Sequence, residues 1–166
     1  AQIVAPQDLH KFAKFKIIPS IQPTHATSDM YWAVERLGEE RIKHAYAYKE
    51  LLKQFGMLAL GSDFPVEHFN PLYGFHAAVA RVDNSGFPQG GFQMENALTR
   101  EEALRGMTIW AAYSCFQEKK RGSIERGKDA DFVILDADIM LEKLENIRTT
   151  KTLRTVIGGE TVYQRN

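Results

Sequence analysis

Two polar side chains, Asp63 and His25, lie at positions where they could take part in catalysis or in ligand binding. Asp63 stands in the stretch LALGSDFPVE, residues 58–67, directly after an apolar run. A carboxylate at this point could accept a proton or bind a metal ion, but aspartate also caps turns for purely local reasons. His25, in QPTHATSD, could contact a substrate or could simply be a surface residue of a loop. The residues alone leave both alternatives open.

The other candidate groups carry weaker signals. Cys115 falls on the apolar stripe of a predicted helix, which favours a place in the core over a role as nucleophile. The glycines of DNSGFPQGG, residues 83–91, do not follow the order of a phosphate-binding loop. No pair of histidines has the spacing H-x-H or H-E-x-x-H that metal sites use. We interpret the remaining four as surface positions of helices or loops: His10, His44, His68 and His76.

The elements that must position Asp63 and His25 alternate between helix and strand. Strands that alternate with helices predict parallel βα units, whose ligands bind beyond the carboxyl ends of the strands. Both side chains follow a predicted strand, so we expect both at one rim of the sheet. The predicted order is a helix opened by Pro6, a strand over 17–21, a polar loop over 24–29, a helix to Gly38, a helix over 39–55 and a strand over 57–61. Ser28 or Asp29 would cap the second of these helices.

The second half of the chain changes character near residue 122. A helix from Pro71 to about Arg81 precedes the glycine-rich loop, and TREE is a capping box that starts a helix at Thr99. Beyond Gly122 the pattern becomes short strands and turns, including a hairpin around Gly158. We therefore predict an α/β body over residues 1–121 and a β-rich segment over residues 122–166.

Composition excludes several classes of function. The chain has 166 residues, of which 44% are hydrophobic, and its 21 basic and 21 acidic side chains give a net charge of zero. This balance predicts no nucleic-acid partner and no attraction to an anionic membrane. No apolar run approaches the length of a membrane span, and a single cysteine makes the cytoplasm the expected compartment.

Several motifs in one order resemble the carboxy-terminal part of an amidohydrolase-superfamily enzyme. The resemblance covers nearly the whole chain, and GSDFPVE together with the GKDADFVILD tail is its most specific part. The branch resembled is amidohydrolase family 3, which includes N-substituted formamide deformylase and exoenzyme-regulatory-like proteins. The motifs are SIQPTHATSDMYWAVERLG, LALGSDFPVE, NPLYGFHAAVAR, LTREEALRGMTIWAAYS and RGSIERGKDADFVILD.

The resemblance implies a fold and a chemistry. Family members are similar in having a (β/α)₈ (TIM) barrel with a small β-sandwich, so the two predicted strands would be the seventh and eighth of the barrel. Asp63 would touch the catalytic metal and act as general base on metal-bound water, whose pKa a zinc ion lowers toward ~7. His25 would contact the substrate or its leaving group. The implied substrate is a small molecule with an amide or formamide-like C–N bond.

The family's other metal ligands have no counterpart here, so we expect a carboxy-terminal fragment of a longer enzyme. One carboxylate and one histidine do not make a zinc site, which predicts no tightly bound metal and no activity in this chain by itself. Two strands without neighbours expose edges, which predicts self-association. Two alternatives stay open: a non-catalytic regulatory or binding protein that keeps the fold, and an independent α/β binding domain.

Overall fold

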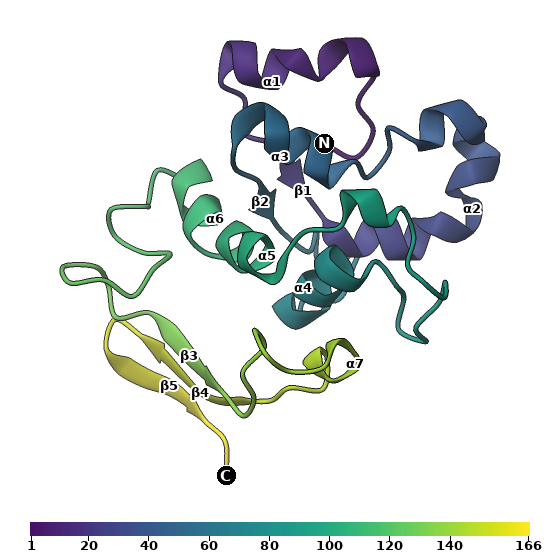
Figure 1. The fold of residues 1–166 in the computed structure, drawn as a ribbon. Coiled ribbons are helices and arrows are strands. Elements are labelled where there is room, and N and C mark those ends of the chain that lie inside the picture. Colours follow the sequence, from purple (N-terminus) through teal and green to yellow (C-terminus); the bar gives the residue numbers. More distant parts are fainter.

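Two short parallel strands lie at the centre of the larger part of the molecule. The computed structural model describes residues 1–166, and its strand β1 (Ser20–Ile21) pairs in parallel with β2 (Ala59–Leu60). Backbone hydrogen bonds extend the pairing at both ends: the Ala59 amide donates to the Pro19 carbonyl and the Gly61 amide to the Ile21 carbonyl. Helices surround the pair in Figure 1. Parallel βα units are thus present, although two strands do not close a barrel.

The segment before β1 begins with a 3-10 turn rather than an α-helix. Pro6 opens η1 (Pro6–Asp8), and α1 (His10–Phe15) follows it. After β1, helix α2 (Pro23–Ile42) begins with a proline in its first turn, where the missing amide proton is not needed. The predicted polar loop over 24–29 is therefore wrong, and neither Ser28 nor Asp29 is a cap. Serine, threonine and aspartate resemble a loop in sequence, but here Pro23 sets the start of the helix.

Gly38 interrupts α2, as its place in the sequence predicts. Its φ of 76° and ψ of 163° are not helical, and glycine adopts them without a steric penalty. The predicted single helix over 39–55 is wrong, because the chain leaves the helix at Ile42 and Ala45 forms a bridge with Ile3. Helix α3 (Tyr48–Phe55) then leads to Gly56 and into β2.

After β2 the chain forms three helices and a compact loop. Asn70 caps α4 (Pro71–Ala80) by accepting a hydrogen bond from the Leu72 amide at 3.0 Å. The short η2 (Met94–Asn96) leads to α5 (Arg100–Met107), where the predicted capping box of Thr99 and Glu102 is present. The helix then breaks at Thr108, and α6 (Ile109–Ser114) ends before an exposed Cys115. The prediction that Cys115 lies in the core is therefore wrong.

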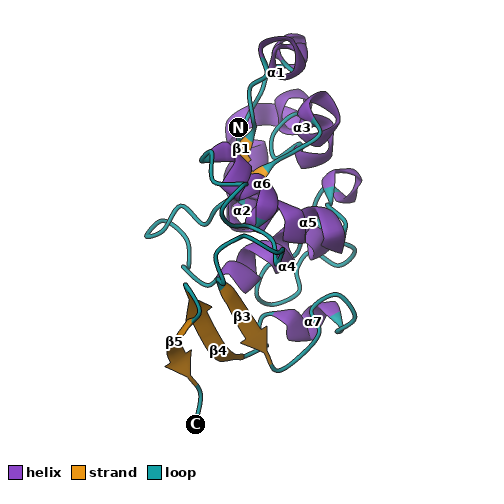
Figure 2. Ribbon diagram, turned by 90° about the vertical axis from the view of Figure 1, so that its left-hand side faces the viewer, coloured by secondary structure: helices purple, strands orange, loops and turns teal.

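The carboxy-terminal segment forms a separate small sheet. Its antiparallel order is β3 (Phe132–Leu135), β4 (Thr152–Ile157) and β5 (Glu160–Gln164), with the predicted hairpin between β4 and β5. Figure 2 shows this sheet beneath the helical body, with α7 (Leu144–Ile147) beside it. Ile139 and Ile147 belong to the same buried cluster as Ile21 and Phe75 of the body. The connection between β3 and β4 therefore packs on the body, whereas β5 is exposed along its length.

The sequence predicts no membrane-spanning segment. The chain contains no helix with both the length and the apolar composition that crossing a bilayer requires.

Candidate functional site

Asp63 and His25 meet at the carboxyl ends of the two parallel strands. Asp63 follows β2 by three residues, and His25 lies in the first turn of α2, just after β1. The Nε2 atom of His25 is 3.8 Å from the Oδ2 atom of Asp63. The prediction that both residues face one rim is thus realised in the geometry. Their separation is too long for a hydrogen bond, and they form an ion pair only when the imidazole is protonated.

The turn around Asp63 does not use its carboxylate. Ser62 makes the local capping bond instead, because its Oγ accepts a hydrogen bond from the Phe64 amide at 3.2 Å. The Asp63 carbonyl accepts from the Val66 amide at 2.8 Å, so only backbone atoms of Asp63 serve the turn. Its φ of 58° is in the left-handed region, and its side chain is 56% exposed. Of the two alternatives for Asp63, local capping is therefore excluded by the contacts.

His25 is buried without hydrogen-bond partners. The residue is 9% exposed, and both ring nitrogens are buried with no hydrogen-bond partner. A buried polar atom without a partner costs roughly 1–3 kcal/mol, so proteins keep few of them and those few call for an explanation. The Nε2 atom of this ring faces the exposed carboxylate of Asp63, so a ligand at the rim would contact both groups from one side. His25 is not the surface loop residue that the alternative reading expected.

A hydrogen bond across the rim holds the loop of Asp63 against the helix of His25. Ser28 Oγ donates to Glu67 Oε1 at 2.6 Å, joining α2 to the loop after β2. Sequence reasoning missed this pair. A signal was present, since Ser28 is three residues after His25 and therefore on the same helical face, and Glu67 ends the stretch that contains Asp63. This contact joins the two segments that carry the candidate side chains.

A second polar network holds helix α2 through Asp29. Tyr46 Oη donates to Asp29 Oδ2 at 2.8 Å, and Gln2 Nε2 donates to the same oxygen at 2.7 Å. Burial, and after it the hydrogen bond to Asp29, raises the pKa of the Tyr46 hydroxyl above its ordinary value. Tyr46 therefore stays protonated and remains a donor, and the two hydrogen bonds to Asp29 tie α2 to Tyr46 and to the amino-terminal Gln2.

Aromatic side chains gather on the loop beyond Asp63. Phe64 meets Phe69 edge to face with ring centres 5.9 Å apart, and the His68 ring stacks on both Phe69 and Tyr73. Phe64 and Phe69 are exposed. His68 is occupied by this stacking and by the Asn70 amide, which donates to its Nδ1 at 3.1 Å. The ring faces and the Nδ1 atom of His68 are therefore engaged within the loop, which leaves His68 less available to bind a ligand.

The residues of this chain do not complete a metal site. No group of three or more histidine, cysteine, aspartate or glutamate side chains is arranged to hold an ion. Asp63 can supply one oxygen and His25 one nitrogen, whereas a catalytic zinc site uses about three protein ligands. No coordination geometry follows from these two groups.

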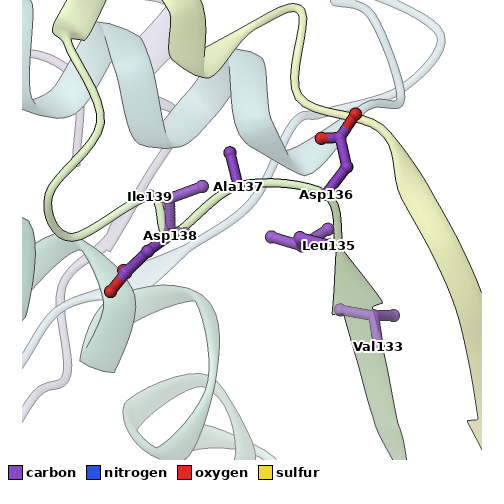
Figure 3. Close-up of a pocket in the computed structure, with 6 residues that line it drawn as sticks. All are labelled: Val133, Leu135, Asp136, Ala137, Asp138 and Ile139. Atoms are coloured by element: carbon purple, nitrogen blue, oxygen red, sulfur yellow. The ribbon is translucent and has the colours of Figure 1, made fainter.

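One hollow of the molecule lies on the carboxy-terminal sheet and not on the strands of this rim. It has a volume of about 440 Å³ and lies at the end of β3, lined by Val133, Leu135, Asp136, Ala137, Asp138 and Ile139 (Figure 3). Its two carboxylates point in opposite directions and both cap backbone amides: Asp136 accepts from Lys151 at 2.7 Å and Asp138 from Met140 at 2.9 Å. Their roles are structural, and the hollow offers no reactive pair.

Comparison with known proteins places the chain among amidohydrolases. YtcJ of Bacillus subtilis, which is named as an amidohydrolase, is 33% identical over 166 residues, which are 100% of this chain and 31% of that protein. The protein LONG AFTER FAR-RED 3 of Arabidopsis thaliana is 34% identical over 98% of this chain and 28% of its own length. N-substituted formamide deformylase of Arthrobacter pascens is 32% identical over 76% of this chain and 23% of its own length. The chain thus spans about a third or less of each relative.

Comparison with solved structures and with family models agrees with these sequence relatives. An uncharacterized metal-dependent hydrolase from Pyrococcus horikoshii superposes with a TM-score of 0.75 at 32% identity, over 87% of this chain and 29% of that chain. The family model described as "Amidohydrolase family" matches residues 1–163. Both strands of the rim, both candidate side chains and the carboxy-terminal sheet lie inside that match. The chain therefore belongs to the amidohydrolase family.

Proposed function

We propose that a protein containing this chain is a metal-dependent hydrolase that cleaves C–N bonds of the amide or formamide type. The observation that carries the proposal is the pairing of an exposed carboxylate, Asp63, with a buried imidazole, His25, that has no hydrogen-bond partner. The family supports hydrolysis, a relative is named N-substituted formamide deformylase, and a structural neighbour is titled a metal-dependent hydrolase. The substrate is accordingly a small molecule, and the reaction needs neither nucleic acid nor membrane.

Asp63 is the proposed general base. Its carboxylate is exposed at the rim and is not used in the turn that carries it, so it is free to accept a proton from an attacking water molecule. The water oxygen bonds to the carbonyl carbon, the C–N bond breaks, and Asp63 passes the proton to the leaving nitrogen. General base catalysis of this kind contributes roughly 10²–10⁴-fold to a rate.

His25 is the proposed substrate contact. A neutral imidazole has one N–H donor and one acceptor nitrogen, and both are unused here. An N–H donated to the substrate carbonyl or to the leaving group would satisfy the ring when the substrate is bound. The Ser28–Glu67 hydrogen bond keeps this ring and the Asp63 carboxylate on facing sides of the site.

A divalent metal, which we propose to be zinc, would supply Lewis-acid activation of the water and of the substrate carbonyl when bound. Asp63 offers it an oxygen ligand, and the remaining ligands would come from elsewhere in the protein. In the same proposal β1 and β2 are the seventh and eighth strands of a (β/α)₈ barrel, residues 1–121 are the end of that barrel, and residues 122–166 belong to a β-sandwich. The proposed compartment is the cytoplasm.

The test is Asp63→Asn in the full-length protein, assayed on a panel of amides and formamides with metal content measured in parallel. Asparagine keeps the shape but cannot accept the proton at neutral pH, so we expect turnover to fall by at least about 10²-fold. Asp8→Asn, which changes an exposed carboxylate in η1, is the matched control and should leave turnover unchanged. Wild-type kinetics in Asp63→Asn with a full metal load would contradict the assigned role.

A non-catalytic binding or regulatory protein is the second candidate. One observation favours it: the Arabidopsis relative matches 98% of the chain, and its name states no reaction. The same assay separates the candidates. A full-length protein that binds metal but turns over no member of the panel, with or without Asp63, would support the binding protein.

A further inference from the structure

A second hollow lies away from the rim, where α4, the loop after it and α7 meet. Its volume is about 370 Å³, and its lining includes His76 and Ala80 of α4, Asn84 and Ser85 of the loop, and Arg148 just after α7. Helix α4 begins after the loop of Asp63 and ends at Ala80, a length of about 15 Å. The hollow is at the far end of that helix and is therefore independent of the proposed hydrolase site.

Arg148 lines this hollow with a positively charged guanidinium group, one of whose N–H donors has no hydrogen-bond partner. Its Nη1 donates to the side-chain oxygen of Asn84, and its Nη2 donates to the Asn84 carbonyl at 2.7 Å. Its Nε is buried and has no partner. Guanidinium groups bind oxyanions through adjacent N–H groups, so one acceptor oxygen beside Nε would complete the set.

The imidazole ring of His76 is the second polar group of this hollow. The residue is 3% exposed, which corrects the sequence interpretation of a surface histidine. Burial first, and the Arg148 cation second, lower the pKa of its ring to about 4. At neutral pH the ring is therefore uncharged and offers an N–H donor rather than a second cation. His76 and Arg148 both line the hollow, so one ligand can contact both groups.

The walls of the hollow are open and well fixed. Three glycines line it: a side chain at Gly86 or Gly90 would meet no atom within 4 Å, whereas one at Gly91 would collide with the Met94 side chain. Asp83 holds the loop in shape by accepting from the Ser85 amide at 2.7 Å and the Phe87 amide at 2.9 Å. The one acidic residue of the lining, Glu145, is exposed. Arg148 and Glu145 are the two charged residues of the lining, so the positive charge is local to the Arg148 guanidinium.

We propose that this hollow binds a small oxyanion, a sulfate or phosphate group, between Arg148 and His76. An oxygen of the anion accepts from Arg148 Nε, and a second oxygen accepts from the His76 ring. The shared chemistry is a tetrahedral oxyanion, which could arrive as the free ion or as the phosphate group of a small metabolite.

The test is an NMR titration of the full-length protein, with its histidines isotopically labelled, with sodium sulfate against sodium chloride at matched ionic strength. We expect the His76 ring signal, assigned through its loss in His76→Asn, to shift saturably with sulfate at neutral pH. We also expect its pKa to rise by roughly one unit, since an anion nearby favours the protonated ring. A phosphomonoester such as glycerol phosphate, compared with inorganic phosphate, shows by its relative affinity whether the metabolite or the free ion is preferred.

Variants and controls decide the outcome. Arg148→Gln should abolish the sulfate response, while Arg154→Gln should retain it, because Arg154 is an arginine on β4 whose side chain donates a hydrogen bond to Gln164. Arg148→Lys keeps the charge without the Nε donor and should weaken binding, which covers the case of a poorly folded Arg148→Gln. The exposed His10 serves as the internal reference. Equal shifts of His76 and His10, or no shift at all in the wild type, would overturn the proposal.

Discussion

Two buried basic side chains, Arg81 and His25, differ in whether their nitrogen atoms have hydrogen-bond partners. Arg81 is 0% exposed, and its guanidinium donates to the Phe92 carbonyl at 2.8 Å, the Tyr46 carbonyl at 3.3 Å and the Gln93 side chain at 3.1 Å. It also lies over the rings of Tyr48 and Phe92. His25 is almost as buried and has no hydrogen bond on its ring.

The difference separates a structural group from a binding group. A buried group whose donors are all used stabilises the native state, and removing it leaves its acceptors unpaired. A buried group with unused donors and acceptors weakens the native state, and it is retained where a ligand completes it. By this criterion Arg81 serves the fold, and His25 fits the role of substrate contact proposed for it. Each of the following changes tests one side of the comparison.

The largest expected effect is that of Arg81→Met. The change leaves two backbone carbonyls without their donor and removes the stacking on Tyr48, so we expect the free energy of unfolding to fall by roughly 3 kcal/mol. Urea denaturation followed by circular dichroism measures it. Arg154→Met on the surface is the control, with an expected change within about 0.5 kcal/mol. Equal stability of the two variants would remove the structural side of the comparison.

The amino-acid sequence predicted the local features of this molecule better than the distant contacts. The capping box at Thr99, the hairpin near Gly158 and the rim position of Asp63 each depend on a few neighbouring residues, and each is recognisable from them. The burial of Arg81 depends on carbonyls 11 and 35 residues away along the chain. No local pattern contains that information.

Two errors have the same physical origin. The segment THATSD has the composition of a loop, but Pro23 opens a helix there and the contact of Ser28 with Glu67, 39 residues later, helps to hold it. His76 has an ordinary helix position in the sequence and becomes buried only when α7 packs beside α4. In both cases tertiary contacts decide between states that local propensity leaves close in free energy.

The next effect in size is the pH dependence due to His76. Its pKa is lowered from 6.5 to about 4 in the folded chain, so the unfolded chain binds the proton more readily. The stability that depends on the neutral ring is complete above pH 6.5 and is lost as the pH falls through that value toward 4. We expect His76→Gln to flatten this part of the profile of unfolding free energy against pH. An unchanged slope in the variant would assign the acid sensitivity to other groups.

The smallest expected change in stability is that of His25→Leu. Leucine removes two buried nitrogens that have no partner, so the free energy of unfolding should stay the same or rise by up to about 1 kcal/mol. His10→Leu, at an exposed position, controls for the general effect of adding an apolar side chain. Urea denaturation of the two variants gives the comparison directly.

The same substitution in the full-length protein should have the opposite effect on function. If His25 contacts the substrate, His25→Leu lowers turnover of the amide or formamide substrate while stability is kept, because the unused nitrogens exist for the ligand and not for the fold. A loss of stability comparable with that of Arg81→Met would show instead that the ring is satisfied in the native protein. His25 would then belong with Arg81 as a structural residue, and the case for the site would rest on Asp63 alone.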